Sequence, residues 1–162
     1  YTYIIREAKH TDAEKILGIM KSSFKNYEKN CKMESEDDHA FKIDALKETT
    51  KDIEKDIETK TVFIAEIDNI AVGTIRIKLL DNKTAYISRF GVVPEYHNIG
   101  IGKSIMNIVF KFLASKNIKS AYLYTASRYT DLVRFYYGRG FYVDSTTTDR
   151  GYIRAKMVKR IT

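Results

Sequence analysis

Residues 84–116 have the sequence TAYISRFGVVPEYHNIGIGKSIMNIVFKFLASK, which predicts a strand, a glycine turn and a helix in direct succession. Residues 84–93 are rich in β-branched and aromatic side chains, which favour a half-buried strand. Pro94 cannot donate to a sheet ladder, so we expect the strand to stop there. Asn117 is a suitable residue to end the helix. One apolar stripe recurs at helical spacing after the turn: Ile101, Ile105, Ile108, Val109, Phe112 and Leu113.

The turn between the strand and the helix has the composition of an anion-binding site. The first N–H groups of a helix lack intrahelical partners and carry the positive end of the helix dipole. Gly100 and Gly102 leave space beside those groups, and Lys103 and Ser104 add a cation and a hydroxyl. These features suit a phosphate or diphosphate. The alternative is a tight turn without a ligand, and the glycines alone do not separate the two.

Two common phosphate-binding motifs fail at this turn. The nucleotide-hydrolase pattern G-x-x-x-x-G-K-[ST] needs glycine at position 97, where the chain has His97. The dinucleotide pattern G-x-G-x-x-G fits Gly100 and Gly102 but meets Ile105 at its third glycine.

A third pattern, V-x-P-x-x-[RQ]-x-x-G-x-G, fits residues 92–102 at every position except His97. It resembles the acetyl-CoA motif of the GNAT family of N-acetyltransferases, in which the departing position acts mainly through its backbone N–H. The resemblance implies that the backbone of Phe90, Gly91 and Val92 holds the pantetheine arm and polarises the acetyl carbonyl. It also implies a cofactor-binding loop made of His97, Asn98, Ile99, Gly100, Ile101, Gly102, Lys103 and Ser104.

Residues 135–141, FYYGRGF, resemble the second signature of that family, F-Y-x-x-x-G-F. The resemblance implies that Tyr136 is the general acid, with Tyr137 a weaker candidate. A phenol with a pKa near about 10 is protonated at neutral pH and can protonate a leaving thiolate. The alternative for Tyr136 is core packing, because the chain has 12 tyrosines. Tyr129 stands where many members have a cofactor-contacting Asn, so we assign it to the cofactor site.

The sequence leaves the general base unassigned. Tyr124 stands where some members that acetylate N-terminal amines have a glutamate. Glu66 is an acidic side chain that could relay the proton, as could ordered water. Gly91 is the candidate for a bulge that separates the strand at 84–93 from the strand at 119–125 and frees backbone N–H groups for the oxyanion.

The N-terminal half predicts a strand and two helices before the sheet continues. Residues 3–7 are a short strand, and Thr11 with Glu14 has capping-box spacing for a helix over residues 12–27, followed by a loop at 28–34. A second helix is expected from Ser35, with one apolar face made of Ile43, Leu46, Thr50, Ile53 and Ile57.

The acidic run at residues 34–38, ESEDD, opens that expected second helix. Carboxylates favour a helix N-terminus, which is one explanation. The other is an electrostatic landing site for a cationic amine.

The remaining segments complete an α/β fold with a mixed, mostly antiparallel sheet. Strands at 61–67, 70–80 and 84–93 form a meander joined by Asp-Asn turns. The strand at 119–125 follows a helix, so a parallel pairing is expected. A helix at 130–138, ended by Gly140, and strands beginning at Phe141 and over 151–158 follow. The element order, β-α-α-β-β-β-α-β-α-β-β, is similar to that of the GNAT family.

Composition predicts one domain over residues 1–162. The chain is 44% hydrophobic and 30% charged, as in soluble globular proteins, and no apolar run is long enough for a membrane span or has the form of a signal peptide. A lone cysteine, Cys31, fits a reducing cytoplasm, and three scattered histidines give no metal spacing.

The functional hypothesis is an acetyl-CoA-dependent N-acetyltransferase that acts on a primary amine by direct attack in a ternary complex, with a small cationic amine slightly favoured. It needs no metal, and a homodimer is common among such domains. The alternative is a non-catalytic module that binds an acyl-CoA and regulates. The net charge of +7 also allows a nucleic-acid binder, but no recognisable motif supports one.

Overall fold

The computed structural model of the chain describes residues 2–31 and 44–162. Within these ranges the strands are β1 (Tyr3–Glu7), β2 (Thr61–Ile67), β3 (Ile70–Leu80), β4 (Thr84–Val92), β5 (Ser120–Ala126), β6 (Tyr142–Thr147) and β7 (Arg154–Arg160). The helices are α1 (Ala13–Cys31), α2 (Thr50–Thr59), α3 (Ile101–Ser115) and α4 (Thr130–Gly138), and short 3-10 turns include η2 (Asp44–Lys47) and η4 (Pro94–Tyr96). The order of strands and α-helices is the one that the sequence predicts.

All seven strands of the described residues form one sheet in the order β1-β2-β3-β4-β5-β7-β6. Every neighbouring pair is antiparallel except β4 and β5, which are parallel. The exception follows from the connection, because α3 carries the chain back from the end of β4 to the start of β5. The predicted α/β fold with a mostly antiparallel sheet is therefore confirmed.

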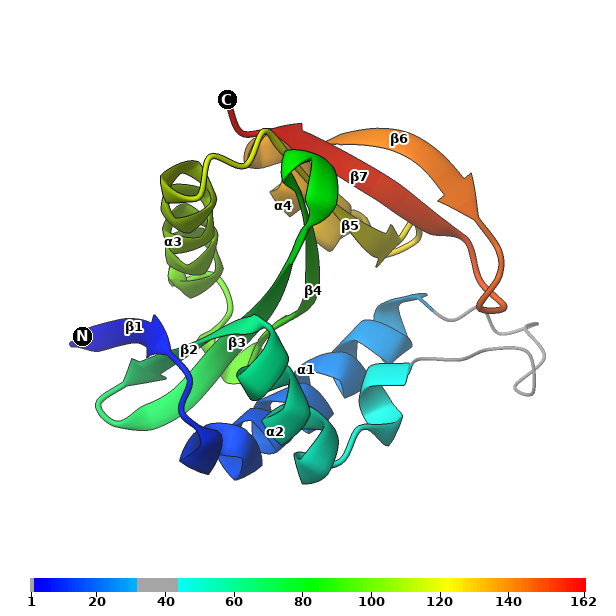
Figure 1. The fold of residues 1–162 in the computed structure, drawn as a ribbon. Helices are drawn as coiled ribbons and strands as arrows, with labels where there is room; N and C mark the ends of the chain where they lie inside the picture. The colour runs from blue at the N-terminus through cyan, green and yellow to red at the C-terminus, as the bar shows by residue number, and fades with distance from the viewer. Residues whose placement is uncertain (1, 32–43) are drawn as a thin grey trace.

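Helices cover both faces of the sheet, with α1 and α2 on one side and α3 on the other (Figure 1). Strand β2 shows how the sequence creates two cores, because alternate side chains point to opposite faces. Val62 and Ile64 pack in a cluster with Ile53 of α2 and residues of α1, whereas Phe63 and Ala65 pack in a cluster with α3. The sheet is thus buried on both faces around its centre.

The first helix begins and ends differently from the prediction. Asp12, not Thr11, makes the first capping contact, since its carboxylate accepts a hydrogen bond of 2.7 Å from the Lys9 N–H. Arg6 also donates to Asp12 at 2.7 Å, and this hydrogen bond lowers the pKa of the buried Asp12 carboxyl to about 2. The predicted loop at 28–34 was wrong at its start, because α1 continues to Cys31.

The prediction of a continuous second helix through Ile57 was wrong. The expected start at Ser35 and the acidic run at 34–38 lie outside the described residues. The described part has the 3-10 turn η2, then a break, then α2. Thr49 causes the break: its extended backbone and its hydroxyl, which accepts from the Asp52 N–H at 3.3 Å, form the N-cap of α2.

The C-terminal boundaries shift by a few residues. Asn117 adopts φ +59° after α3, so the expected helix end is confirmed. The last strand was expected at 151–158 but runs from Arg154 to Arg160, because Gly151 (φ +82°) lies in the turn that precedes it. Among the described helices, none combines the length and the apolar character needed to cross a bilayer.

Candidate active site

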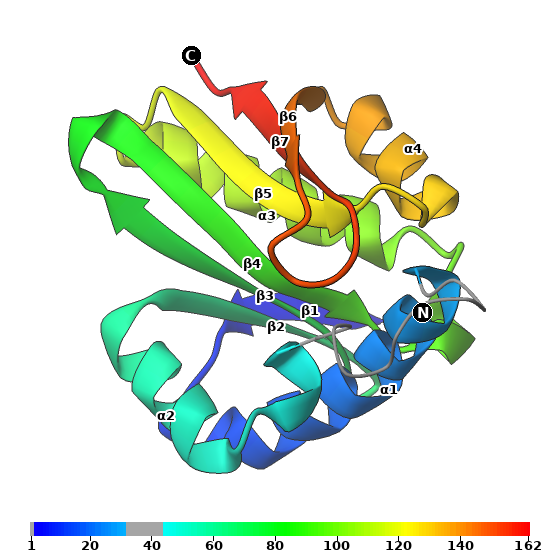
Figure 2. The same cartoon turned by 90° about the vertical axis from the view of Figure 1, so that its right-hand side faces the viewer.

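A gap between β4 and β5 dominates the centre of the sheet. The parallel pairing covers only Thr84–Tyr86 against Ser120–Tyr122. Beyond these three pairs the strands diverge toward the side on which α1 and α4 lie (Figure 2). Within residues 2–31 and 44–162, the backbone groups of β4 that point away from β3 in this region therefore have no strand partner, which is the arrangement needed to bind an extended ligand.

A bulge lies in β4 beside this gap, but not at the residue expected. Thr74 of β3 pairs with Gly91, whereas Arg76 pairs with Ser88, so Arg89 and Phe90 together oppose one residue of β3. Arg89 has the left-handed value φ +53°, which costs an L-residue roughly 1–2 kcal/mol. The expectation that Gly91 forms the bulge is corrected accordingly.

Gly91 has a different steric role. A Cβ at this position would overlap the side chain of Ser23 on α1. Ser23 is itself fixed, because its hydroxyl donates a hydrogen bond of 2.7 Å to the Ile19 carbonyl. Glycine therefore allows α1 to approach β4 closely at the edge of the gap.

The loop before α3 presents backbone N–H groups in one direction. Asn98 (φ +65°) and Gly100 (φ +88°) adopt left-handed conformations, and the first bond of the helix runs from the Ser104 N–H to the Gly100 carbonyl at 3.0 Å. The N–H groups of residues 101–103 precede that bond and so lack helical acceptors. With Lys103 beside them, they form an arrangement that suits a phosphate or diphosphate.

A cleft of about 490 Å³ joins this loop to the gap in the sheet. Most of the predicted cofactor residues line it: Phe90, Gly91, Val92, His97, Asn98, Gly100, Gly102, Lys103 and Tyr129. Three do not. The side chain of Ile99 is exposed, Ile101 is buried in the core, and the Ser104 hydroxyl lies 3.2 Å from the Tyr3 hydroxyl. Glycine at position 102 allows α3 to pack closely against Phe90, since a Cβ there would lie 3.2 Å from the Phe90 ring.

His97 is held by the chain itself. Its backbone N–H donates to the Pro94 carbonyl at 3.1 Å, and its ring Nε2 donates to the Val92 carbonyl at 2.8 Å. Its N–H is thus already paired in this structure, although the family resemblance gives that N–H to the cofactor. The His97 ring instead fastens the loop to the end of β4.

Helix α1 supplies a wall of the cleft that the sequence did not predict. The Asn26 amide donates to the Tyr129 hydroxyl at 3.0 Å, and the Ala126 N–H donates to the Tyr27 hydroxyl at 2.7 Å. The rings of Tyr27 and Tyr129 lie 5.8 Å apart. These contacts connect α1 to the end of β5 and the start of α4 along the wall of the cleft. Residues so far apart in the chain carry no sequence signal for such a bridge.

Tyr136 on α4 does not line this cleft but the smaller cavity described below. Its side chain is 4% exposed and packs against Phe90, Phe135 and Phe141. Burial raises the pKa of the Tyr136 phenol far above its ordinary value, with a smaller contribution from Tyr129. The hydroxyl therefore stays protonated and can act as a donor. The weaker candidate, Tyr137, is 52% exposed and lines neither the cleft nor the smaller cavity.

A second, smaller cavity of about 90 Å³ adjoins the cleft, and Phe90 lines both. The Thr125 hydroxyl lies buried at this cavity and has no hydrogen-bond partner among the described residues. The polar and aromatic side chains that line it include Asp44, Ser88, Arg89, Tyr124, Thr125, Tyr136, Arg150 and Arg154. Its position next to Tyr136 suits an acceptor.

Among the described residues, Asp131 of α4 is the one acidic side chain that lines the larger cleft. Glu66, which the sequence leaves open as a relay, lines neither cavity and forms an ion pair with Arg6 at 2.9 Å. Asp44 lines the smaller cavity but is paired with Arg150. Tyr124 lines it too, and there the Arg154 guanidinium lies 4.7 Å from its ring centre. Within residues 2–31 and 44–162, no group of three or more His, Cys, Asp or Glu residues is arranged to hold a metal ion.

Comparison with solved structures supports the fold. The chain superposes on a PaiA N-acetyltransferase from Thermoplasma acidophilum, solved with coenzyme A, with a TM-score of 0.83, 20% identity and 99% of each chain covered. It also matches an acetyltransferase of the GNAT family from Staphylococcus aureus Mu50, with a TM-score of 0.77, 21% identity and coverage of 99% of this chain and 100% of the other. At these identities the likeness concerns the fold alone.

Comparison at the sequence level gives the family. A spermidine N(1)-acetyltransferase from Thermoplasma acidophilum is 33% identical over 79 residues, which are 49% of this chain and 48% of that protein. The matched segment thus spans about half the length of this curated relative. The family model described as "Acetyltransferase (GNAT) family" matches residues 22–141. The chain therefore belongs to the GNAT acetyltransferase family.

Proposed function

We propose that the chain transfers an acetyl group from acetyl-CoA to a primary amine, by direct attack within a ternary complex. The observation that carries this proposal is the cleft that joins the N–H groups before α3 to the gap between β4 and β5, next to the smaller cavity that Tyr136 lines. Family membership agrees with it. The same geometry would serve a binding module, so catalysis depends on whether an amine can react there.

The chain's own groups have separable roles in this reaction. Acetyl-CoA supplies an activated acyl carbon, held as a thioester. The N–H groups of residues 101–103 and the ammonium of Lys103 hold the diphosphate. Backbone N–H groups of β4 beyond the bulge donate to the carbonyl oxygen as it gains negative charge.

Proton transfer balances the reaction. A carbon–nitrogen bond forms and the carbon–sulfur bond breaks, so the amine must lose a proton and the departing thiolate must gain one. The Tyr136 hydroxyl donates to the thiolate. We assign the removal of the amine proton to water in the smaller cavity, because the Asp44 carboxylate there is paired with Arg150 and Asp131 lines the larger cleft instead.

The class of amine is the finer part of the proposal. The sequence slightly favours a small cationic amine because of the acidic run at 34–38, which lies outside the described residues. The activity named for the spermidine acetyltransferase relative supports that preference. The described lining of the smaller cavity does not add to it, because Arg89, Arg150 and Arg154 outnumber Asp44.

A thiol-release assay tests the proposal. The protein is mixed with acetyl-CoA and with one amine at a time from a panel of polyamines, aminoglycosides, small amine metabolites and peptides with free N-termini. We expect free thiol to appear only when a suitable amine is present, and the acetylated amine to be detected by mass spectrometry. Binding of acetyl-CoA without release by any amine would instead support the non-catalytic alternative.

A further inference from the structure

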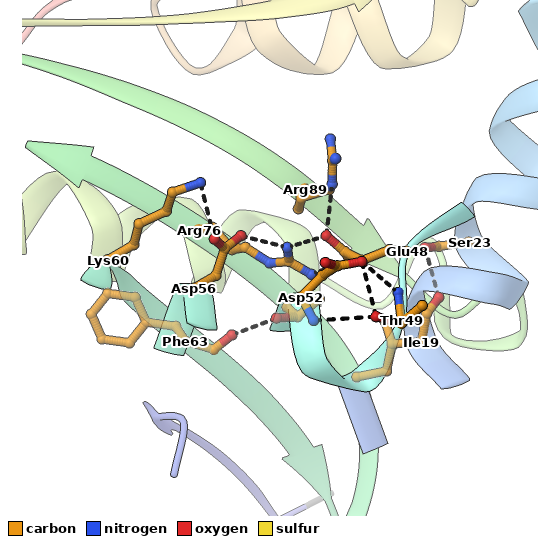
Figure 3. Close-up of polar contacts among 11 residues, drawn as sticks. Ile19, Ser23, Glu48, Thr49, Asp52, Asp56, Lys60, Phe63, Arg76 and Arg89 are labelled. Atoms are coloured by element: carbon orange, nitrogen blue, oxygen red, sulfur yellow. Dashed lines mark hydrogen bonds and ion pairs between the residues drawn. The ribbon is translucent and has the colours of Figure 1, made fainter. Parts of the chain in front are cut away.

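A group of four charged residues around a buried arginine, which we call the Arg76 cluster, connects β3, β4, α2 and the segment before α2 (Figure 3). It consists of Arg76, Glu48, Asp56 and Arg89. Arg76 on β3 is 0% exposed and donates to both oxygens of Glu48, at 2.6 and 2.5 Å, and to Asp56 at 2.8 Å. Two carboxylates thus surround one fully buried guanidinium, which satisfies the need of a buried charge for partners.

Glu48 is shared between two strands, whereas Asp56 is not. The Oε2 atom of Glu48 that binds Arg76 also lies 3.5 Å from the Nε atom of Arg89. Asp56 instead pairs with Lys60, at the C-terminal end of its own helix, at 3.3 Å. Within the described residues Glu48 is therefore the acid that reaches the bulge of β4.

Arg89 is the residue at which the bulge takes its left-handed conformation. The bulge sits next to the pairing of Arg76 with Ser88 and includes Phe90, immediately before Gly91, at the edge of the gap. Because the Arg89 side chain is tied to Glu48, its backbone conformation is tied to the position of Glu48 as well. The contact thus acts on the part of β4 that would hold a thioester.

Glu48 does not line the smaller cavity, but it lies close in the chain to residues that do. Glu48 directly follows η2, and Asp44 and Ala45 of η2 line that cavity. The Glu48 side chain is only 6% exposed, so it does not itself reach an acceptor. Through its place in the chain and its contact with Arg89, Glu48 connects η2, which lines the smaller cavity, to the β4 bulge.

We propose that Glu48 is a positioning residue, which through Arg89 fixes the β4 bulge so that the following N–H groups face the reacting carbonyl. The inference rests on the proposed acetyl transfer for its kinetic consequence. Its structural consequence, a bulge held by Glu48, is independent of any activity.

The test compares two carboxylates that both bind Arg76. Glu48→Gln removes the charge that reaches Arg89, and Asp56→Asn is the matched control that leaves that contact intact. We expect Glu48→Gln to lower kcat by about tenfold to a hundredfold, the size of effect that a displaced reacting group produces, with little change in KM for acetyl-CoA. Asp56→Asn should leave kcat within about twofold while lowering Tm, because both variants weaken the partners of Arg76.

Substitutions of Arg89 provide a second test and should leave the chain able to fold, since the Arg89 side chain is 30% exposed. Arg89→Ala should lower kcat as Glu48→Gln does, Arg89→Lys should restore part of the loss, and the double variant Glu48→Gln/Arg89→Ala should be no slower than the worse single variant. Amide hydrogen exchange at Phe90 and Gly91 should accelerate in Glu48→Gln and Arg89→Ala but not in Asp56→Asn.

Two results would overturn the inference. One is an equal loss of kcat in Glu48→Gln and Asp56→Asn, which would reduce Glu48 to a partner of Arg76. The other is unchanged exchange at the bulge in both Glu48→Gln and Arg89→Ala. If the unmodified protein acetylates no amine, the proposed function fails, but the exchange experiment still decides whether Glu48 holds the bulge.

Discussion

Tyr136 and Tyr137 are adjacent in the chain yet lie in opposite surroundings. Both are on α4, but Tyr136 is buried and lines the smaller cavity, whereas Tyr137 is exposed and lines neither cavity. The sequence ranks Tyr136 first through its resemblance to a family signature, and the fold places that residue beside both Phe90 and the smaller cavity. A role in proton donation stays a prediction that a substitution can test.

Replacing Tyr136 by Phe is expected to lower kcat by about tenfold to a thousandfold, because the leaving thiolate would lose its proton donor. The packing of the ring is retained, so KM for acetyl-CoA and Tm should change little. Steady-state kinetics with a reactive amine measures this. Tyr137→Phe is the control and should behave like the unmodified protein; equal losses in both variants would remove Tyr136 from the chemistry.

The pH dependence provides a separate check on Tyr136. Burial raises its pKa well above the ordinary phenol value, so the protonated, donating form persists to higher pH than that of an exposed tyrosine. We therefore expect kcat to show no decline due to this group below about pH 10. A descending limb near about pH 8 to 9 that disappears in Tyr136→Phe would contradict the assignment.

Single residues of the site could be predicted where a residue type, such as glycine, is required by the backbone conformation. The glycine spacing identified the loop before α3, in which Asn98 and Gly100 take left-handed dihedral angles. The bridge between Asn26 and Tyr129 could not be predicted, since it depends on how closely α1 approaches α4. Glycine at position 91 predicts a bulge there, but it is Arg89, 3.5 Å from Glu48, that takes the left-handed conformation.

At the scale of elements, boundaries were accurate where two signals coincided. Strands β2 and β3 are rich in β-branched residues and are separated by Asp68 and Asn69, both of which have positive φ, so their predicted limits match the structure. The second helix failed because apolar spacing continues across Thr49, whereas the capping of α2 by Thr49 interrupts the backbone. The spacing of apolar residues thus predicts which side chains face the core, but it does not show whether the helix is continuous.

The loop before α3 gives a prediction about glycine conformation. Gly100 has φ +88° and no atom within 4 Å of an added Cβ, so Gly100→Ala creates backbone strain of roughly 1–2 kcal/mol and no clash. If the loop relaxes to relieve it, the N–H groups turn away from the diphosphate. We expect the Kd for coenzyme A to rise about tenfold, measured by titration calorimetry.

Gly18→Ala serves as the control for that substitution. Gly18 lies within α1, and nothing lies within 4 Å of an added Cβ. Alanine in a helix interior is more favourable than glycine by about 0.5–1 kcal/mol, so Tm should rise and the affinity for coenzyme A should stay the same. An unchanged affinity in Gly100→Ala would mean that the loop conformation does not govern binding.

For the whole molecule, the two sides of the gap belong to different parts of the chain. Strands β1 to β4 form one side, and β5 with β6 and β7 forms the other. A ligand in the cleft contacts residues of both parts, because Gly91 and Tyr129 line it together. Binding should therefore stabilise the two parts as one unit.

We expect coenzyme A at about 100 times its Kd to add about 2.7 kcal/mol of stability and to raise Tm by roughly 5–10 °C. Differential scanning calorimetry measures the shift. Pantetheine, which lacks the diphosphate, is the control and should give a much smaller shift at the same concentration. Equal shifts for both ligands would mean that the groups before α3 do not bind phosphate.

The short parallel contact between β4 and β5 has a mechanical consequence. Three residue pairs fasten one half of the sheet to the other, whereas β3 and β4 or β5 and β7 are paired over nearly their whole lengths. If the molecule were stretched between Tyr3 and Arg160, we expect β4 to separate from β5 before β3 separates from β4 or β5 from β7. Among the described strands, the place that leaves room for a ligand is thus also where neighbouring strands share the fewest paired residues.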